Sequence, residues 1–200
     1  MVYFIQQPLE ISMKNAMCVF LLLCCASVLA EEAFKQENKP ENLKALLEQT
    51  HKALHDKKDT KLAASLFSSL VPDEARLKKA LKDGVDADTI KKISDQHKAF
   101  AINEQTVVKL AKPEQTVVKV HAATTEEIMK YEKGTPAFQE FPGGTKRVAE
   151  LLLRPGTTYY EAEFLEPGKD AGMKFHLFYW DGEHWSMLGP VWRIVREPAK

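Results

Sequence analysis

Histidine and acidic side chains near the end of the chain are the first candidates for chemistry. His176 and His184 lie in one short stretch with Asp181 and Glu183, and all four side chains can bind a metal or transfer protons. If Asp181-Gly182 forms a two-residue hairpin turn, strand alternation points the two histidines to opposite faces. We therefore predict no metal site here. A three-residue loop with a bulge would bring both histidines to one face and restore that possibility.

Other titratable pairs have simpler explanations. His51 and His55 have the i, i+4 spacing of helical metal sites, but no acidic motif accompanies them, and an exposed helix face accounts for them. Glu161 and Glu163 share a strand face and could do acid–base work, yet this is also the ordinary polar side of a half-buried strand. The chain lacks the usual nucleotide, zinc-protease, serine-hydrolase and EF-hand motifs. We predict no cofactor, assign no catalytic residue and favour a non-catalytic function.

A run of strands over residues 159–195 must position these side chains. The segments YYEAEFLE, KFHLFYW, EHWSML and VWRIV are rich in aromatic and β-branched residues and are bounded by Gly, Pro and Asp. Pairing of Trp180 with Glu183 gives one face with His176, Phe178, Trp180, Trp185 and Met187. The other face then has Phe175, Leu177, Tyr179, His184 and Leu188. Both faces are largely apolar, so upstream helices should cover one, and a cavity, ligand, partner or loops should cover the other.

The aromatic face is the predicted functional surface. We expect this face, or a pocket in it, to bind a small apolar ligand or a protein partner. The alternative is that its aromatic residues form the main core of the domain. The candidate ligand-binding residues are Tyr160, His176, Phe178, Trp180, Trp185 and Arg193. Two other functions stay open. One is a cofactor-independent hydrolase or isomerase that uses His176 and a carboxylate in the sheet cavity, and the other is a structural domain that forms a homodimer.

Four helices are predicted before the sheet. Apolar residues at three-and-four spacing indicate a helix over residues 40–58. Asp59 and Asp73 can cap the next two, which stop before Pro72 and at Gly84. Either Asp86 or Asp88 can cap the fourth, whose apolar stripe holds Ile90, Ile93, His97 and Phe100.

The middle of the chain contains a near-repeat, EQTVVKLAKP followed by EQTVVKVHAA. The second copy predicts a strand over residues 116–121, whereas the first, at residues 103–111, could be a strand or a short helix. Thr124 and Glu127 form a capping box for a helix that closes at Gly134, followed by irregular chain over residues 135–144. Residues 145–153 suit a helix capped by Thr145 better than a hairpin strand.

The N-terminal residues indicate export. Residues 16–30 form an apolar run too short to span a bilayer, preceded by Lys14 and ending in small residues, which is typical of a signal peptide cleaved after Ala30. An uncleaved membrane anchor and a lipoprotein are the alternatives, and Met13 could be the working start. All three cysteines lie in this segment, so the mature chain would have no disulfide. We predict a periplasmic or secreted protein whose only membrane contact is the signal segment.

The remaining chain is predicted to be one α+β domain. Residues 31–39 form a charged tether, and residues 40–197 form the domain, with a helical part over 40–101 and a strand-rich part over 102–197. We expect N-terminal helices packed on a C-terminal curved antiparallel β-sheet. The chain has 28 basic and 28 acidic residues, and this balance argues against binding of nucleic acid, which needs a basic excess.

The order of elements over about residues 40–195 resembles the NTF2-like superfamily, a cystatin-like α+β cone. This superfamily contains both enzymes and binding domains. The Asp–His pair of some of its enzymes has no recognisable counterpart in this chain, so the resemblance implies a fold and no activity. The segments FPGG, LRPGTTYYEAEFLEPGKDAGMKFHLFYWDG and WSMLGPVWR also resemble uncharacterised secreted bacterial proteins of planctomycete type, which implies export.

Overall fold

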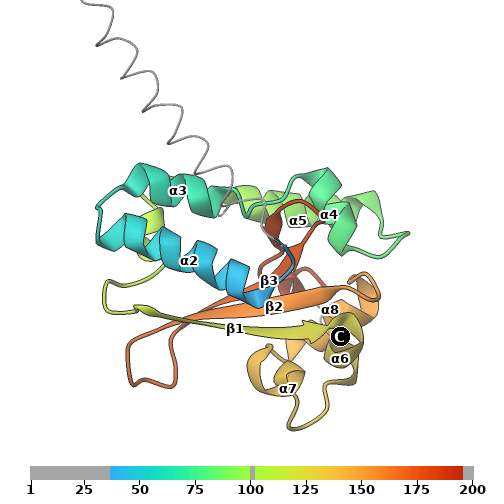
Figure 1. Cartoon of the computed structure of the whole chain (residues 1–200). Helices are drawn as coiled ribbons and strands as arrows, with labels where there is room; N and C mark the ends of the chain where they lie inside the picture. The colour runs from blue at the N-terminus through green and yellow to red at the C-terminus, as the bar shows by residue number, and fades with distance from the viewer. Residues whose placement is uncertain (1–36, 100–101, 196–200) are drawn as a thin grey trace, which may run out of the picture. The chain divides into compact units, whose positions relative to one another are not determined.

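The structure is a computed structural model that describes residues 37–99 and 102–195. The predicted signal segment, most of the tether and Phe100 lie outside these residues. The fold is α+β, as predicted, with helices in the N-terminal half and an antiparallel sheet in the C-terminal part (Figure 1). The helices are α2 (Pro40–His55), α3 (Thr60–Ser68), α4 (Glu74–Ala80), α5 (Ala87–Ala99), α6 (Thr125–Lys130), α7 (Pro136–Glu140) and α8 (Gly144–Leu151). The strands are β1 (Val117–Thr124), β2 (Thr158–Leu165), β3 (Met173–Trp180) and β4 (Trp185–Met187), and two 3₁₀ helices are η1 (Val107–Lys109) and η2 (Val191–Arg193).

The sheet has the order β1-β2-β3-β4, with every neighbouring pair antiparallel. The predicted register of the last hairpin is wrong by two residues, because Trp180 pairs with Trp185 and Phe178 with Met187. The loop therefore holds four residues, 181–184. The physical reason is the Asp181 side chain, which accepts hydrogen bonds from the amides of Glu183 and His184. These bonds stabilise a four-residue loop in place of the predicted two-residue turn.

A β-bulge interrupts the pairing of β2 with β3. The register shifts by one residue between Tyr160 and Ala162, so Glu161 lies opposite both His176 and Leu177. Leu177 has a φ of 56°, in the left-handed region that leucine rarely adopts. The bulge reverses the alternation of side chains along β3.

The predicted division of β3 into two faces is therefore wrong at its N-terminal half. Phe175 pairs with Ala162 and Phe178 with Tyr160, so both phenylalanines lie on the same face. His176 lies with Glu161 on the opposite face. A single inserted residue causes this change, because strand side chains alternate with a period of two.

Most predicted helix starts are confirmed. The side chains of Asp59, Asp73 and Asp86 accept hydrogen bonds from backbone amides in the first turns of α3, α4 and α5. Thr124 and Glu127 form the predicted capping box of α6. That helix ends at Lys130, earlier than expected.

The two copies of the near-repeat fold differently. Its second copy forms β1, as predicted, and its first copy contains the 3₁₀ helix η1. Tertiary surroundings decide between them, since the two segments have nearly the same sequence.

Three local expectations are wrong. Residues 136–140 form α7, with Pro136 in its first turn and a side-chain cap from Thr135. Helix α8 is confirmed, but its cap is Gly143, because the Thr145 hydroxyl donates to the Pro142 carbonyl. The segment VWRIV contains η2 and no strand. Residues 188 and 189 still donate their amides to the carbonyls of residues 177 and 176 of β3, and the chain leaves the sheet after them, where residues 191 and 193 donate to residues 189 and 190 instead.

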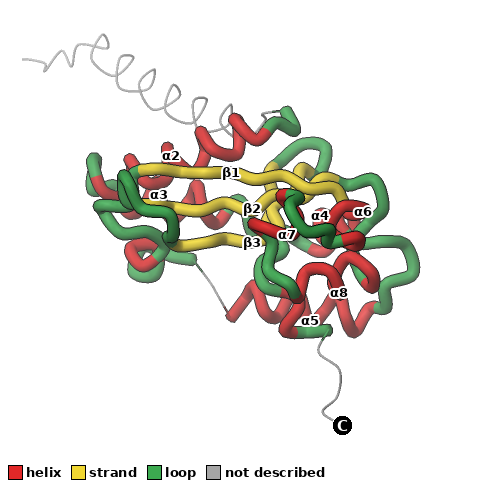
Figure 2. The backbone as a smooth tube through the Cα atoms, turned by 90° about the horizontal axis from the view of Figure 1, so that it is seen from below, coloured by secondary structure: helices red, strands yellow, loops and turns green. Residues whose placement is uncertain are grey.

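Helices cover both faces of the sheet, so the chain itself supplies the second cover. On one face, Phe164 packs against His51 of α2 and Phe175 against Phe67 of α3. Helices α6, α7 and α8 lie on the other side of the sheet (Figures 1 and 2). Residues of α4 to α8 form one apolar cluster with Tyr159, Leu177 and Tyr179 of the strands. No helix in residues 37–99 and 102–195 is long and apolar enough to cross a membrane.

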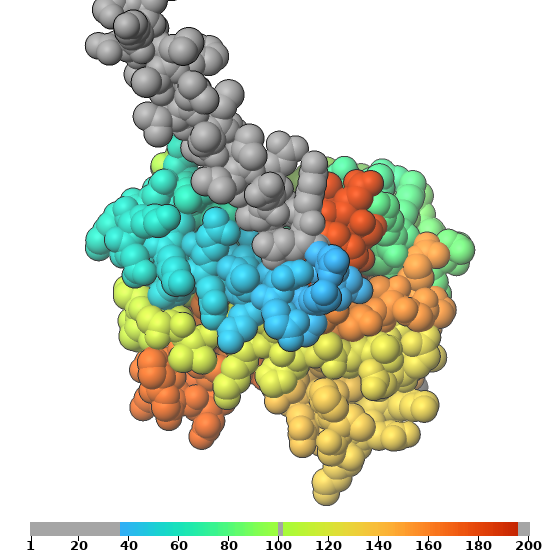
Figure 3. All heavy atoms as spheres, in the orientation of Figure 1, coloured from blue at the N-terminus to red at the C-terminus, as the bar shows by residue number. Residues whose placement is uncertain are grey.

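Arg76 of α4 ties the helical part to the last hairpin. Its Nε donates to Asp181 Oδ2 at 2.6 Å, and its Nη2 donates to the Trp185 carbonyl and to Ser186 Oγ. Its Nη1 donates to the Ser69 carbonyl. In Figure 3 the surface of the hairpin region, in red-orange, adjoins the green region that contains α4 and α5.

The charge of Asp181 is stabilised inside this contact. Burial by itself raises the pKa of Asp181, but hydrogen bonds from the amides of His184 and Glu183, together with the Arg76 guanidinium, outweigh burial and hold the pKa below its ordinary value. The carboxylate is therefore ionised at neutral pH, and it stabilises the folded state.

We predict that Asp181→Asn lowers the free energy of unfolding by about 2 to 3 kcal/mol at neutral pH, because it leaves Arg76 without its counter-charge. A folded-state pKa below the ordinary value of 3.8 means that this stability is present above that value and is lost as the pH falls through the folded-state pKa. Urea denaturation of both proteins should thus show a smaller difference at pH 3 than at pH 7.

The control is Asp83→Asn. Asp83 pairs with Arg154, but its side chain is 91% exposed, so this variant should unfold like the unsubstituted protein. An Asp181→Asn effect of the same size at both pH values would contradict the electrostatic explanation.

Candidate functional site

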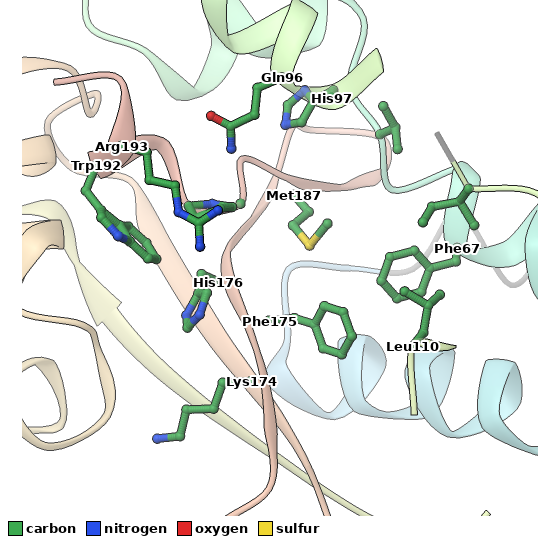
Figure 4. Close-up of a pocket in the computed structure, with 14 residues that line it drawn as sticks. Phe67, Gln96, His97, Leu110, Lys174, Phe175, His176, Met187, Trp192 and Arg193 are labelled. Atoms are coloured by element: carbon green, nitrogen blue, oxygen red, sulfur yellow. The ribbon is translucent and has the colours of Figure 1, made fainter. Parts of the chain in front are cut away.

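A cavity of about 320 Å³ lies beside the part of β3 that has no partner in β4 (Figure 4). Strand β4 pairs with residues 178–180, and the amides of residues 188 and 189 donate to the carbonyls of residues 177 and 176, so residues 173–175 of β3 form an edge there. Helices α3 and α5, the segments that flank η1, and the segment from β4 through η2 supply the other walls. The lining residues are Phe67, Val71, Gln96, His97, Ile102, Leu110, Lys174, Phe175, His176, Met187, Gly189, Pro190, Trp192 and Arg193.

The two ends of this cavity differ in polarity. Phe67, Phe175 and Leu110 gather at one end, and Met187 lies between the ends (Figure 4). The charged and polar side chains occupy the other end: Gln96, Lys174, His176 and Arg193, with Trp192 beside them. A molecule with an apolar body and a polar head matches this arrangement.

His176 forms a close pair with Glu161 at the polar end. Its Nδ1 lies 2.5 Å from Glu161 Oε2, and the Leu177 amide donates to Glu161 Oε1 at 3.2 Å. Glu161 is buried, and burial holds its pKa above the ordinary value of a glutamate. The hydrogen bond and charge of His176 act in the opposite direction but do not outweigh burial. The bulge creates this pair, since it brings two groups of β3 to one buried carboxyl.

Lys174 has carboxylate partners of its own. Its Nζ lies 3.1 Å from Glu140 Oε2 of α7 and 3.8 Å from Glu163 Oε2 of β2. His121 of β1 lies 3.7 Å from the same Glu140 oxygen. The positive charge of Lys174 is therefore compensated within the sheet face next to the cavity.

Arg193 differs from Lys174 because no hydrogen bond or ion pair joins its guanidinium to the described residues, and only its backbone amide is bonded, to the Pro190 carbonyl. Its neighbour Trp192 is held in place by two contacts. The Trp192 ring meets His176 edge-on at 5.0 Å between centroids, and it packs so closely on Gly144 that a Cβ there would lie 2.9 Å from the indole. Gly144 thus allows α8 to approach the cavity wall.

His97 of α5 also lines the cavity. Its Nε2 lies 2.9 Å from the Leu188 carbonyl, and burial lowers its pKa. His97 lies on the predicted apolar stripe of α5, and its side chain is buried as that stripe implies.

The structure places only two of the six predicted ligand-binding residues, His176 and Arg193, at the cavity. Phe178, Trp185 and Tyr160 are buried on the face that packs against α2 and α3. Trp180 is half-buried and meets the Trp185 ring at 5.5 Å between centroids. These four aromatic residues thus lie in the core rather than at the cavity.

Sequence reasoning missed most of the cavity lining. The sequence predicts strands at three lining residues, Lys174, Phe175 and Met187, but no site there. Two others, Phe67 and Leu110, come from distant parts of the chain. Glu161 was considered only with Glu163. No sequence signal revealed the bulge that pairs Glu161 with His176.

The other histidines have structural roles. His51 and His55 do not form an exposed pair, because His51 is buried and their Nε2 atoms lie 3.1 Å and 3.0 Å from the carbonyls of Lys112 and Ala111. Burial and the neighbouring His51 lower the pKa of His55. His184 lies in the hairpin loop, 4.0 Å from Asp181. The part of the chain that the structure describes contains no group of three His, Cys, Asp or Glu residues that could hold a metal.

We predict that Phe178→Ala lowers the free energy of unfolding by about 3 to 5 kcal/mol, because it leaves a hole at a fully buried position. Thermal or chemical denaturation measures this change. The same substitution at Phe138, which is 43% exposed, is the control and should have little effect. Equal effects of the two substitutions would contradict the assignment of Phe178 to the core.

Comparisons with models of protein families, with curated proteins and with solved structures give no match for this chain. The resemblance to the NTF2-like superfamily therefore stays a prediction. The function must be inferred from the geometry of the cavity and from the residues that line it.

Proposed function

We propose that this protein binds a small, largely apolar ligand in the cavity beside β3. The observation that carries the proposal is the cavity itself, whose volume of about 320 Å³ falls at the lower end of the range for ligand sites. Its walls come from five separate parts of the fold, so the shape exists before any ligand arrives. A preformed apolar site binds with little cost of ordering.

The chemistry of the lining favours binding over catalysis. The fourteen described lining residues include no Ser, Thr, Cys or Tyr that could act as a hydroxyl or thiol nucleophile. The Lys174 ammonium is engaged by two carboxylates, of Glu140 and Glu163. Phe67, Phe175, Leu110 and Met187 instead offer a surface for an apolar molecule.

The predicted signal segment adds a location to this proposal. With cleavage after Ala30, the binding domain would act in the periplasm or outside the cell. No cysteine follows residue 25, so the cavity would not depend on the redox state of that compartment.

We predict that Leu110→Trp blocks the apolar end of the cavity and weakens binding of the uncharged dye N-phenyl-1-naphthylamine by about tenfold or more. Titration of the dye, followed by its fluorescence, measures the dissociation constant. The control is Val108→Trp, which puts the same side chain on η1 at a position that is 48% exposed and outside the cavity.

Equal dye affinity in both variants would contradict ligand binding at this site, as would failure of the unsubstituted protein to bind the dye. The melting temperatures of both variants should match that of the unsubstituted protein, so that a loss of binding reports the cavity and not unfolding.

Acid–base catalysis is a second candidate function, favoured by the contact between His176 and Glu161. If Nδ1 of His176 donates to the buried carboxylate, Nε2 is free to accept a proton from a water molecule. Such a pair could activate water for attack on an ester whose apolar part fills the cavity.

The test of this second function is hydrolysis of p-nitrophenyl butyrate. We predict that His176→Gln lowers kcat by about a hundredfold while the dye still binds, since general base catalysis typically contributes a factor of this order. Absence of turnover by the unsubstituted protein, or equal turnover by the variant, would reject the catalytic candidate without affecting the binding proposal.

A further inference from the structure

We infer that the ligand of the cavity beside β3 is an apolar molecule with a carboxylate head, and that Arg193 binds this head. This inference rests on the proposed binding function and adds the chemical class of the ligand. Two observations support it: the charged residues of the lining are all basic, and Arg193 alone among them has no acidic partner in the described residues.

The described lining carries positive charge and no negative charge. Lys174, His176 and Arg193 all lie at the polar end, and none of the fourteen lining residues is an aspartate or a glutamate. A cavity with this lining disfavours a cationic ligand and favours an anionic one, because charges act strongly near low-dielectric walls.

Two of the three basic side chains, His176 and Lys174, already have partners outside the cavity. Glu161 contacts His176 at 2.5 Å, and Glu140 contacts Lys174 at 3.1 Å. Neither carboxylate lines the cavity, so in both pairs the acidic residue lies outside the ligand space. These pairs leave little attraction for a further anion at Lys174 or His176.

Arg193 is the uncompensated charge of the lining. Its guanidinium has no hydrogen bond or ion pair with the described residues, and it points into the ligand space, beside Trp192 and below Gln96 (Figure 4). A guanidinium presents two parallel N–H donors that match the two oxygens of a carboxylate. The carboxylate is therefore the head group that this end of the cavity fits best.

The apolar lining sets the rest of the ligand. A tail that starts at Arg193 passes Met187 and reaches Phe67, Phe175 and Leu110 at the other end (Figure 4). This arrangement favours a medium-chain or aromatic monocarboxylate over a sugar or a nucleotide, because the apolar end offers few hydrogen-bonding groups.

The test is competition of octanoate and octan-1-ol against bound N-phenyl-1-naphthylamine. The two competitors share a chain of eight carbon atoms and differ only in the head group. We expect octanoate to bind about fivefold more tightly at low salt, although octan-1-ol is the more apolar molecule, because only octanoate pairs with the guanidinium. Added salt should reduce this preference, since Arg193 is exposed.

Arg193→Gln should abolish the preference for octanoate, measured as the ratio of the dissociation constants of octanoate and octan-1-ol in the same variant. Arg193→Lys, which keeps the charge but not the paired donors, should keep only part of the preference. The matched control is Lys109→Gln, which removes the same charge from an exposed position of η1 outside the lining and should behave like the unsubstituted protein.

The outcomes separate the two proposals. Equal binding of octanoate and octan-1-ol by the unsubstituted protein overturns the carboxylate inference and leaves the apolar site in place. A preference that survives Arg193→Gln, or that Lys109→Gln also removes, overturns the role of Arg193. Failure of the dye and of both competitors to bind overturns the proposed function itself.

Discussion

The buried carboxyl of Glu161 is the constraint on which the sheet and the cavity both depend. A carboxyl group inside a sheet must find hydrogen-bond donors, because an unpaired buried charge strongly destabilises a fold. The bulge in β3 supplies two, from the His176 ring and the Leu177 amide. Leucine in the left-handed region is strained, and strain of this kind is tolerated only where surrounding contacts hold the backbone in place.

The bulge also decides which side chains meet on each face of the sheet. It lets Phe175 and Phe178 point to the same side, so a continuous aromatic layer forms under α2 and α3. It sends His176 to the other face at the polar end of the cavity. A strand without the bulge would exchange these positions, because its side chains alternate strictly.

The short last strand explains why a cavity exists at all. β4 has only three residues, and its end is fixed by Arg76, which holds Asp181, Ser186 and the Trp185 carbonyl. After residue 189 the chain leaves the sheet, so residues 173–175 of β3 have a neighbouring strand on the β2 side alone. Helices α3 and α5 and the C-terminal segment close around that edge without filling it.

The sequence by itself determined the elements whose signals are local. Periodic leucines and capping aspartates such as Asp59 and Asp73 predict helices, because a cap satisfies amides within its own first turn. Alternating aromatic residues likewise predict the strands and the α+β class. Only the tertiary structure decided the hairpin register, the bulge and the cavity. The partners of Asp181 and Glu161 include groups far away along the chain or across a strand, and Arg76 lies 105 positions from Asp181. Such contacts leave no mark on the local pattern of the sequence, since their energy depends on which distant groups the fold brings together.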